Sequence, residues 1–303
     1  AWLMRHTRQA FQAIVVWSSN QCRILVEELG VPRRNVHWVR YGVDLNFWRP
    51  MDVEAGKPRE GGAAAVVPSE TLGSQADVAP QASDIPRADI PAGAASEPAD
   101  SDNAPMICSV GMEMRDYPTL VQALQGTGIR CHIATGTSRG ELFGTVRRLF
   151  DLDSLPDGLT IGKRSFTELR DLYAQSRFVV IPLLPTDSDN GLTTMVEAMA
   201  MGKAVICSKV EGQVDILTHG LTGFFVPQGD PQALRDLMLR LLADPDLTRR
   251  IGRQARAYVC AHHSLEQSLD RVVRIVRQAA GTDREDVPQP SWAPSAASSD
   301  ANP

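Results

Sequence analysis

Short apolar runs alternate with amphipathic segments along most of this chain. The apolar runs predict strands at residues 106–110, 129–135, 159–161, 178–181, 204–207 and 224–226. Segments with apolar positions at helical spacing predict helices at 117–124, 138–150, 165–175, 193–201, 213–217, 231–243, 246–262 and 264–279. This order predicts an α/β fold with a Rossmann-like doubly wound parallel sheet, whose loops after the strands converge on one cleft.

The first 50 residues show the same alternation on a smaller scale. They predict a helix at 2–12, a strand at 14–17, a helix at 19–29 that stops before Gly30 and Pro32, and a strand at 36–40. This pattern is one βαβ unit.

Composition divides the chain further. Residues 51–105 are rich in Ala, Pro, Gly, Ser and acidic residues and almost lack aromatics, and residues 281–303 are rich in Pro, Ser, Ala and Asp. Such segments bury too little apolar area to offset the entropy of ordering them. We therefore expect a disordered linker at 51–105, a disordered tail at 281–303, and an ordered domain at 106–280.

Charge and cysteine usage narrow the classes of function. The net charge of −5 gives no reason to expect nucleic acid as a partner. None of the five cysteines forms a C-x-x-C pair, and Cys108, Cys131 and Cys207 fall in predicted strands, where a thiol behaves as a small core residue. These features argue against a disulfide framework or a zinc site and predict a cytoplasmic protein without a metal cofactor.

The most informative stretch lies between the strands predicted at 178–181 and 204–207. The loop formed by Asn190, Gly191, Leu192, Thr193 and Thr194 leads directly into an apolar helix. Amides at a helix N-terminus and the positive end of the helix dipole favour an anion such as a diphosphate.

Within that helix, Glu197 is the one acidic residue among apolar or small neighbours. A carboxylate in such surroundings is costly unless it is paired or used. Together with the amides at the start of the helix, it predicts a site for a sugar nucleotide.

Further glycine motifs follow in a fixed order. They are Glu211-Gly-Gln-Val-Asp215, Gly220-Leu-Thr-Gly223 and Gly229-Asp230. With them, residues 179–235 resemble the donor-binding half of the GT-B-fold glycosyltransferases of the retaining group 1 (family 4-like) type. Residues 42–50 resemble the exit from the N-terminal domain of that family. The resemblance thus implies that 1–50 are a remnant of the acceptor-side domain and 106–280 the nucleotide-sugar donor domain.

The resemblance assigns roles to two carboxylates. Glu197 takes the position of the family's glutamate on the ribose hydroxyls of the donor. The family's second acid precedes it with seven residues between, which places it at Asp189, in contact with the transferred sugar and stabilising positive charge at the anomeric carbon. Asp187 is close enough to be the true counterpart, and the two alternatives stay open.

The loop after the strand at 106–110 departs from the family pattern. The family has an arginine directly after the glycine, whereas Met112 follows Gly111 here. Arg115 is the best remaining cation for bidentate contact with the diphosphate and for assisting the leaving group, and Glu113 lies in the same donor loop.

Gly162 and Lys163 follow another predicted strand. In the family, their counterparts hold the nucleotide base through backbone groups. Lys163 is thus either a second cationic contact or part of a solvated turn.

The function implied by the resemblance is transfer of a hexose from a nucleotide-diphosphate sugar to an acceptor hydroxyl with retention of configuration. The acceptor would be a glycan or a lipid-linked sugar, no metal would be needed, and contact with the inner membrane surface stays open. The alternative is a sugar-nucleotide-binding fragment or pseudoenzyme without turnover, since most of the N-terminal half would be missing. A nicotinamide-dependent enzyme is disfavoured because no G-x-G-x-x-G follows the first strand of the domain, whereas epimerase chemistry on the same fold stays open.

Overall fold

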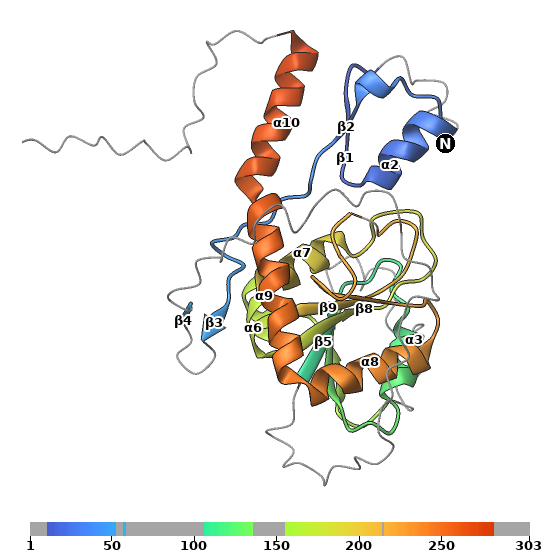
Figure 1. Ribbon diagram of the computed structural model, residues 1–303, viewed down its shortest axis with the longest axis vertical. Helices are drawn as coiled ribbons and strands as arrows, with labels where there is room; N and C mark the ends of the chain where they lie inside the picture. Colours follow the sequence, from blue (N-terminus) through green and yellow to red (C-terminus); the bar gives the residue numbers. More distant parts are fainter. Residues whose placement is uncertain (1–10, 53–56, 59–105, 136–154, 214, 282–303) are drawn as a thin grey trace, which may run out of the picture.

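Six parallel strands form one sheet in the order β10-β9-β8-β5-β6-β7 (Figure 1). The computed structural model describes residues 11–52, 57–58, 106–135, 155–213 and 215–281. In chain order the strands of this sheet are β5 (Met106–Val110), β6 (Arg130–Ala134), β7 (Leu159–Gly162), β8 (Phe178–Ile181), β9 (Ala204–Ser208) and β10 (Phe224–Val226).

The strand order creates a switch point beside β5. From β5 the chain moves outward through β6 and β7, and then returns to β8 on the other side of β5 and continues through β9 to β10. β5 and β8 pair at Cys108 and Val179. In doubly wound sheets, ligands bind beyond the carboxyl ends of the strands at such a point. The cleft is therefore expected next to Gly111 and Pro182.

Helices cover both faces of the sheet, which makes three layers. One face packs against α3 (Tyr117–Leu124) and α8 (Pro231–Ala243) through a cluster that includes Leu120 and Met238. The other face packs against α6 (Phe166–Gln175), α7 (Leu192–Ala200) and α9 (Pro245–His262) through a cluster that includes Met195 and Met199. The methionines of α7 are fully buried, as their helical spacing predicts for core residues.

Polar side chains set the starts of most helices. Asp116, Ser165, Asp230, Asp244 and Ser264 each accept a hydrogen bond from a backbone N–H in the first turn of the following helix. Ser165 and Glu168 complete a reciprocal capping box on α6. These caps explain why the predicted helix starts lie within a residue or so of the observed ones.

The three strand cysteines lie in the centre of the sheet. Cys108 on β5, Cys131 on β6 and Cys207 on β9 are at most 1% exposed. Burial raises the pKa of all three thiols, to about 12 for Cys108 and Cys207. They are structural core residues, as their positions in apolar runs predict.

A smaller βαβ unit precedes the sheet domain. β1 (Ile14–Val16) pairs in parallel with β2 (Val36–Trp38), and α2 (Ser19–Arg23) connects them, followed by the π-helical turn η1 (Ile24–Glu28) and the 3-10 turn η2 (Arg33–Asn35). Its apolar cluster is separate from the two clusters of the main sheet. The helix predicted at 19–29 is thus α-helical only to Arg23 and then widens into a π-helical turn.

The last helix returns to this small unit. α10 (Leu265–Ala280) begins where Val43 exchanges backbone hydrogen bonds with His263 and Leu265 (Figure 1). A Cβ at Gly42 would lie 2.6 Å from the Cβ of Ser268. A side chain at Gly42 would therefore separate the exit of the N-terminal unit from α10. Within the described parts of the chain, no helix combines the length and apolarity that crossing a membrane requires.

The predicted α/β fold and all six strands of the sheet are confirmed. The helix predicted at 213–217 is wrong. Gln213 donates its side-chain amide to the carbonyl of Asn190, and Asp215 accepts hydrogen bonds from Ser19, so long-range bonds hold this segment as a loop.

Several predictions concern residues that the structure does not describe. The helix predicted at 138–150, most of that at 2–12, most of the linker at 51–105 and the tail after 281 lie outside the described residues. At the start of the predicted linker, β3 (Met51–Asp52) pairs antiparallel with β4 (Lys57–Pro58).

Candidate functional site

Arg115 joins the two glycine loops of the predicted donor site. Its guanidinium donates Nε–H to the carbonyl of Val110 (3.0 Å), Nη1–H to the carbonyl of Glu113 (2.9 Å) and Nη2–H to Oγ1 of Thr194 (3.3 Å). The first two acceptors belong to the end of β5 and the loop after it, and Thr194 lies in the first turn of α7. One buried side chain therefore fixes the β5 loop against the start of α7.

Both glycines of these loops pack directly over this guanidinium. A Cβ at Gly111 would lie 2.5 Å from Nη2 of Arg115, and one at Gly191 would lie 3.5 Å from Nη1 and 2.9 Å from Cγ2 of Ile181. Gly111 has φ +104° and Gly191 has φ +90°, backbone conformations that favour glycine. Each glycine thus allows its loop to approach the same cation.

The burial of Arg115 is unusual for a cation. Its exposed fraction is 5%, and among the residues that the structure describes no carboxylate lies within ion-pair distance of it. Burial lowers the pKa of Arg115. A buried charge without a counter-ion is costly, so an anion near this guanidinium would be stabilised. Three of its five N–H groups are already donated to protein, and a bidentate contact with phosphate stays a prediction.

The N-terminus of α7 lies beside Arg115. Gly191 is the N-cap and has no side chain to cap the helix, and the first helical bond runs from the N–H of Met195 to the carbonyl of Gly191. The amides of Thr193 and Thr194 therefore precede the first N–H that donates within the helix, whereas that of Leu192 donates to the carbonyl of Asp189. Of the amides in the predicted cradle, those of residues 193 and 194 are therefore oriented to bind an anion, and that contact stays a prediction.

Glu197 is buried on α7, with an exposed fraction of 6%. Its Oε2 accepts a hydrogen bond of 3.1 Å from the hydroxyl of Tyr173 on α6. Burial raises the pKa of Glu197 to about 7, although the Tyr173 hydrogen bond opposes the shift. The carboxyl group therefore titrates near neutral pH and is able to donate or accept a hydrogen bond there.

The loop before α7 that carries Asp187 and Asp189, called the acid loop below, contacts the N-terminal unit. Nε2 of Gln21 on α2 donates to Oδ1 of Asp189 (2.9 Å), and Asp189 is half-buried. Asp187 is exposed, and its carbonyl accepts from Nδ2 of Asn20 (2.8 Å). Of the two candidate acids, Asp189 has the carboxylate that is held by another element. Its assignment as the acid that faces the sugar stays a prediction.

The remaining predicted residues lie around this centre. The backbone carbonyl of Glu113 accepts a hydrogen bond from Arg115, and Glu113 itself is exposed. Side-chain Oδ1 of Asn190 accepts from Oγ1 of Thr186 (2.8 Å). Gly162 is the last residue of β7 and exposed Lys163 follows it, and β6 separates β7 from β5. Their contact with the base stays a prediction.

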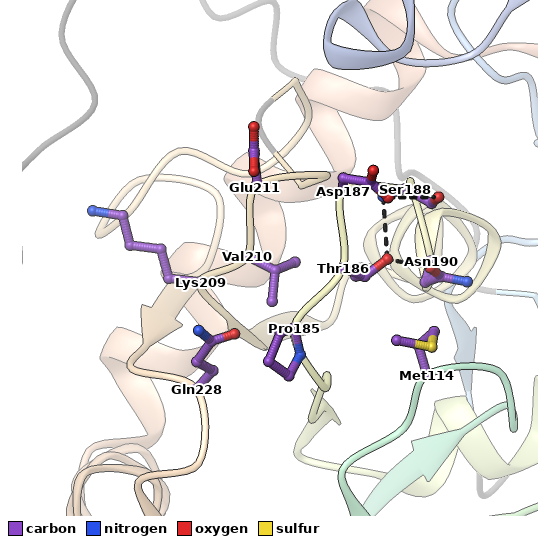
Figure 2. A pocket seen from close by; sticks show the side chains of 10 residues that line it. All are labelled: Met114, Pro185, Thr186, Asp187, Ser188, Asn190, Lys209, Val210, Glu211 and Gln228. Atoms are coloured by element: carbon purple, nitrogen blue, oxygen red, sulfur yellow. Dashed lines mark hydrogen bonds between the residues drawn. The ribbon is translucent and has the colours of Figure 1, made fainter. Parts of the chain in front are cut away.

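A cavity of about 740 Å³ opens beside the acid loop (Figure 2). It lies beyond the carboxyl ends of β8, β9 and β10 and shares Asn190 with the predicted site. Its lining is mostly polar and comprises Met114, Pro185, Thr186, Asp187, Ser188, Asn190, Lys209, Val210, Glu211 and Gln228. Most of these residues carry no motif of their own, and only the strand order indicates that their loops meet.

Sequence reasoning also missed Tyr173 and Gln21. Tyr173 is 24 residues before Glu197 on another helix, and Gln21 is 168 residues before Asp189. An aromatic residue in an amphipathic helix reads as core, and a glutamine in a short helix carries no functional pattern. In the described segments, no group of three or more His, Cys, Asp or Glu side chains could hold a metal ion.

Three comparisons place this architecture among known proteins. The model of the family "Glycosyl transferases group 1" matches residues 112–244. N-acetyl-alpha-D-glucosaminyl L-malate synthase of Bacillus anthracis is 32% identical over 101 residues, which cover 33% of this chain and 25% of that protein. The lipopolysaccharide core biosynthesis mannosyltransferase LpcC of Rhizobium leguminosarum is 26% identical over 117 residues, covering 39% and 33%.

Among solved structures, Anabaena HepE in complex with UDP and glucose has a TM-score of 0.61 at 16% identity, covering 93% of this chain and 65% of that one. This likeness shows the fold. The chain spans only between 20% and 34% of the curated relatives that it matches. The family match covers the β5 loop, Arg115, the acid loop and α7. Over residues 112–244, this chain is similar to the group 1 glycosyltransferases.

Proposed function

We propose that this chain supplies the donor-binding half of a glycosyltransferase that moves a hexose from a nucleotide-diphosphate sugar to an acceptor hydroxyl with retention of configuration. The single observation that carries the proposal is the buried Arg115 guanidinium, which lies beneath Gly111 and Gly191 and beside the N-terminus of α7. A buried cation with no carboxylate within ion-pair distance among the described residues, a glycine in each of two loops and helix amides without an acceptor in the helix are features that suit a diphosphate.

The diphosphate would lie over the two glycine loops. Amides of 193 and 194 would donate to its oxygens, and the charge of Arg115 would stabilise them from the protein interior, where the low dielectric strengthens the interaction. During transfer, negative charge grows on the departing diphosphate. Groups already fixed toward that charge lower the barrier without having to reorganise, and Arg115 is fixed by three hydrogen bonds.

Glu197 would bind the ribose of the donor. Its Oε2 is engaged by Tyr173, which leaves Oε1 to accept from a sugar hydroxyl. Asp189 would face the transferred hexose and stabilise the positive charge that develops at its anomeric carbon. In a single step, retention means that the acceptor hydroxyl attacks from the face that the diphosphate leaves and passes its proton to the departing diphosphate, and the protein's contribution is to position both.

The relatives support a sugar nucleotide as donor. The Anabaena HepE structure holds UDP and glucose. The Bacillus anthracis relative is named an N-acetyl-alpha-D-glucosaminyl L-malate synthase and the Rhizobium relative a mannosyltransferase. The mannosyltransferase builds lipopolysaccharide core. We therefore propose a glycan or lipid-linked acceptor. We also propose that the reaction uses no metal ion.

Thermal unfolding of the full chain with UDP, GDP, ADP and their sugar conjugates tests the donor site. A ligand at 100 times its Kd adds about 2.7 kcal/mol of stability, which raises the Tm of a domain of this size by about 5–10 °C. We expect one nucleotide to give this shift and Glu197→Ala to abolish it. Absence of a shift with every nucleotide, from a folded protein, would contradict the proposal.

The second candidate is sugar-nucleotide binding without turnover. It is favoured by one fact, namely that the chain spans only between 20% and 34% of its curated relatives. Release of free hexose or transfer to an added acceptor, followed with a radiolabelled donor, separates the two. A nucleotide that stabilises the chain without either product would support the binding-only alternative.

A further inference from the structure

The first turn of α2 is bonded to the two loops that border the candidate site. The backbone N–H and the hydroxyl of Ser19 both donate to the carboxylate of Asp215, at 2.6 and 2.5 Å. Arg23 forms an ion pair of 3.0 Å with Glu211. The N-terminal unit is thus fixed to the acid loop and to the loop after β9 through polar contacts, and Gln21 makes the contact that reaches a candidate catalytic group.

The orientation of the Gln21 amide is determined by its other partner. Oε1 of Gln21 accepts the backbone N–H of Trp17 at 3.1 Å, and Nε2 donates to Oδ1 of Asp189 at 2.9 Å. A backbone N–H only donates, so the carbonyl end of the amide must face Trp17 and the NH2 end must face Asp189. The backbone N–H of Gln21 itself donates to the capping hydroxyl of Ser18 (3.1 Å). Both ends of the residue are therefore held.

Asp189 depends on this donor. Partial burial raises the pKa of Asp189, and the negative charge of Asp215 adds to the rise, while the Gln21 amide and a backbone hydrogen bond lower it. In the described residues, no Lys, Arg or His side chain lies within ion-pair distance of Asp189. The neutral Gln21 amide is thus the side-chain donor that favours the carboxylate form.

We propose that Gln21 is a positioning residue for Asp189, by which the N-terminal βαβ unit orients the acid that faces the donor sugar. The inference rests on the proposed function, in which Asp189 stabilises charge at the anomeric carbon. It assigns the small unit a part in the reaction beyond forming one side of the cleft. An interaction that fixes a charged group in place lowers the barrier because less reorganisation is needed during transfer.

Three variants of the full chain test this role. Gln21→Met keeps the length of the side chain and removes the donor. Gln21→Glu keeps the shape and the acceptor for Trp17 but places a second negative charge beside Asp189. Arg23→Gln removes an ion pair of the same interface without touching Asp189 and is the matched control. Circular dichroism confirms that each variant is folded before it is compared.

The first readout is the titration of Asp189, followed by carbon-13 NMR of labelled aspartate carboxyls and assigned with Asp189→Asn. We expect the pKa of Asp189 to rise in the order wild type, Gln21→Met, Gln21→Glu and to stay unchanged in Arg23→Gln. In kinetics, we expect kcat to fall about tenfold in Gln21→Met, the loss of about 1.4 kcal/mol of one hydrogen bond to a charged group. KM for the donor should change less than twofold. The acid limb of the profile of kcat against pH should shift to higher pH.

Failures of the two proposals are distinguishable. An Asp189 titration that Gln21→Met leaves unchanged, or that Arg23→Gln shifts equally, overturns the positioning role whether or not the chain transfers sugar. An equal fall of kcat in Gln21→Met and Arg23→Gln also overturns it, because that result indicates general docking. If wild type shows no transfer while the titration shifts in the expected order, the proposed transfer is overturned and the Gln21–Asp189 contact stands.

Discussion

The hydroxyl of Tyr173 donates a 3.1 Å hydrogen bond to Oε2 of Glu197, and both side chains are buried. The two residues belong to adjacent helices, α6 and α7, on the same face of the sheet. This contact holds a carboxyl group that burial makes reluctant to ionise, and it leads to two predictions about pH.

Glu197→Gln should remove a pH dependence of stability. The pKa of Glu197 is raised to about 7 in the folded chain from an ordinary value of 4.5. Between pH 4.5 and pH 7 the folded chain therefore binds a proton that the unfolded chain does not. Glu197 favours the folded state at low pH, and this contribution is lost as the pH rises from about 4.5 to about 7. The difference is about 3 kcal/mol. Urea unfolding between pH 4.5 and 8 should show that loss in wild type and a flatter curve in Glu197→Gln; parallel curves would refute it.

Tyr173→Phe should destabilise the chain more at high pH than at low pH. Above pH 7 the ionised Glu197 loses the donor that Tyr173 provides, which costs about 1–3 kcal/mol. Near pH 5 Glu197 is protonated and loses only a bond between neutral groups, about 1 kcal/mol. Urea midpoints at pH 5 and pH 8 measure both. Equal losses at the two pH values would mean that the bond does not act through the charge of Glu197.

Gly111→Ala should weaken nucleotide binding. The added methyl would lie 2.5 Å from Nη2 of Arg115, so the guanidinium must move away from Thr194. Gly126→Ala is the matched control, because Gly126 also has a positive φ (+68°) but has open space around it. We expect at least a tenfold increase in nucleotide Kd, by calorimetry, for Gly111→Ala alone. A similar Kd in both variants would show that Arg115 does not need its observed position.

Lys203→Ala should destabilise the chain by about 1–2 kcal/mol. Nζ of Lys203 donates to the carbonyls of Ala174 (2.7 Å) and Ser176 (2.8 Å) at the C-terminal end of α6, where a cation also complements the helix dipole. The control is Arg249→Ala, whose ion pair with Asp246 is exposed and worth about 0–1 kcal/mol. Chemical unfolding at pH 8 compares them, and equal losses would argue against the capping role.

The sequence predicts the strands and capped helices because their signals are local. Apolar runs such as 178–181 and capping residues such as Ser165 need no distant information. The segment at 213–217 was predicted wrongly because its pattern is short and its structure depends on Asn190 and Ser19, which are far away in the chain. Long-range partners decide such loops.

The candidate site divides in the same way. Gly111, Gly191 and Glu197 carry motif signals, and the structure brings the two glycines together over Arg115. Their partners were not predictable, because Tyr173 and Gln21 reach the site through packing of separate elements. The burial of Arg115 was likewise unforeseen, since an arginine in a polar loop normally points to solvent.

The central cysteines provide an intrinsic reporter of unfolding. Cys108, Cys131 and Cys207 lie on three strands of one sheet and are enclosed, so a thiol reagent reaches them only when the sheet opens. Cys22 and Cys260 are partly exposed and react without such opening. The slow phase of labelling therefore measures how often the sheet domain opens, and a nucleotide that binds this domain would slow that phase in the unmutated protein.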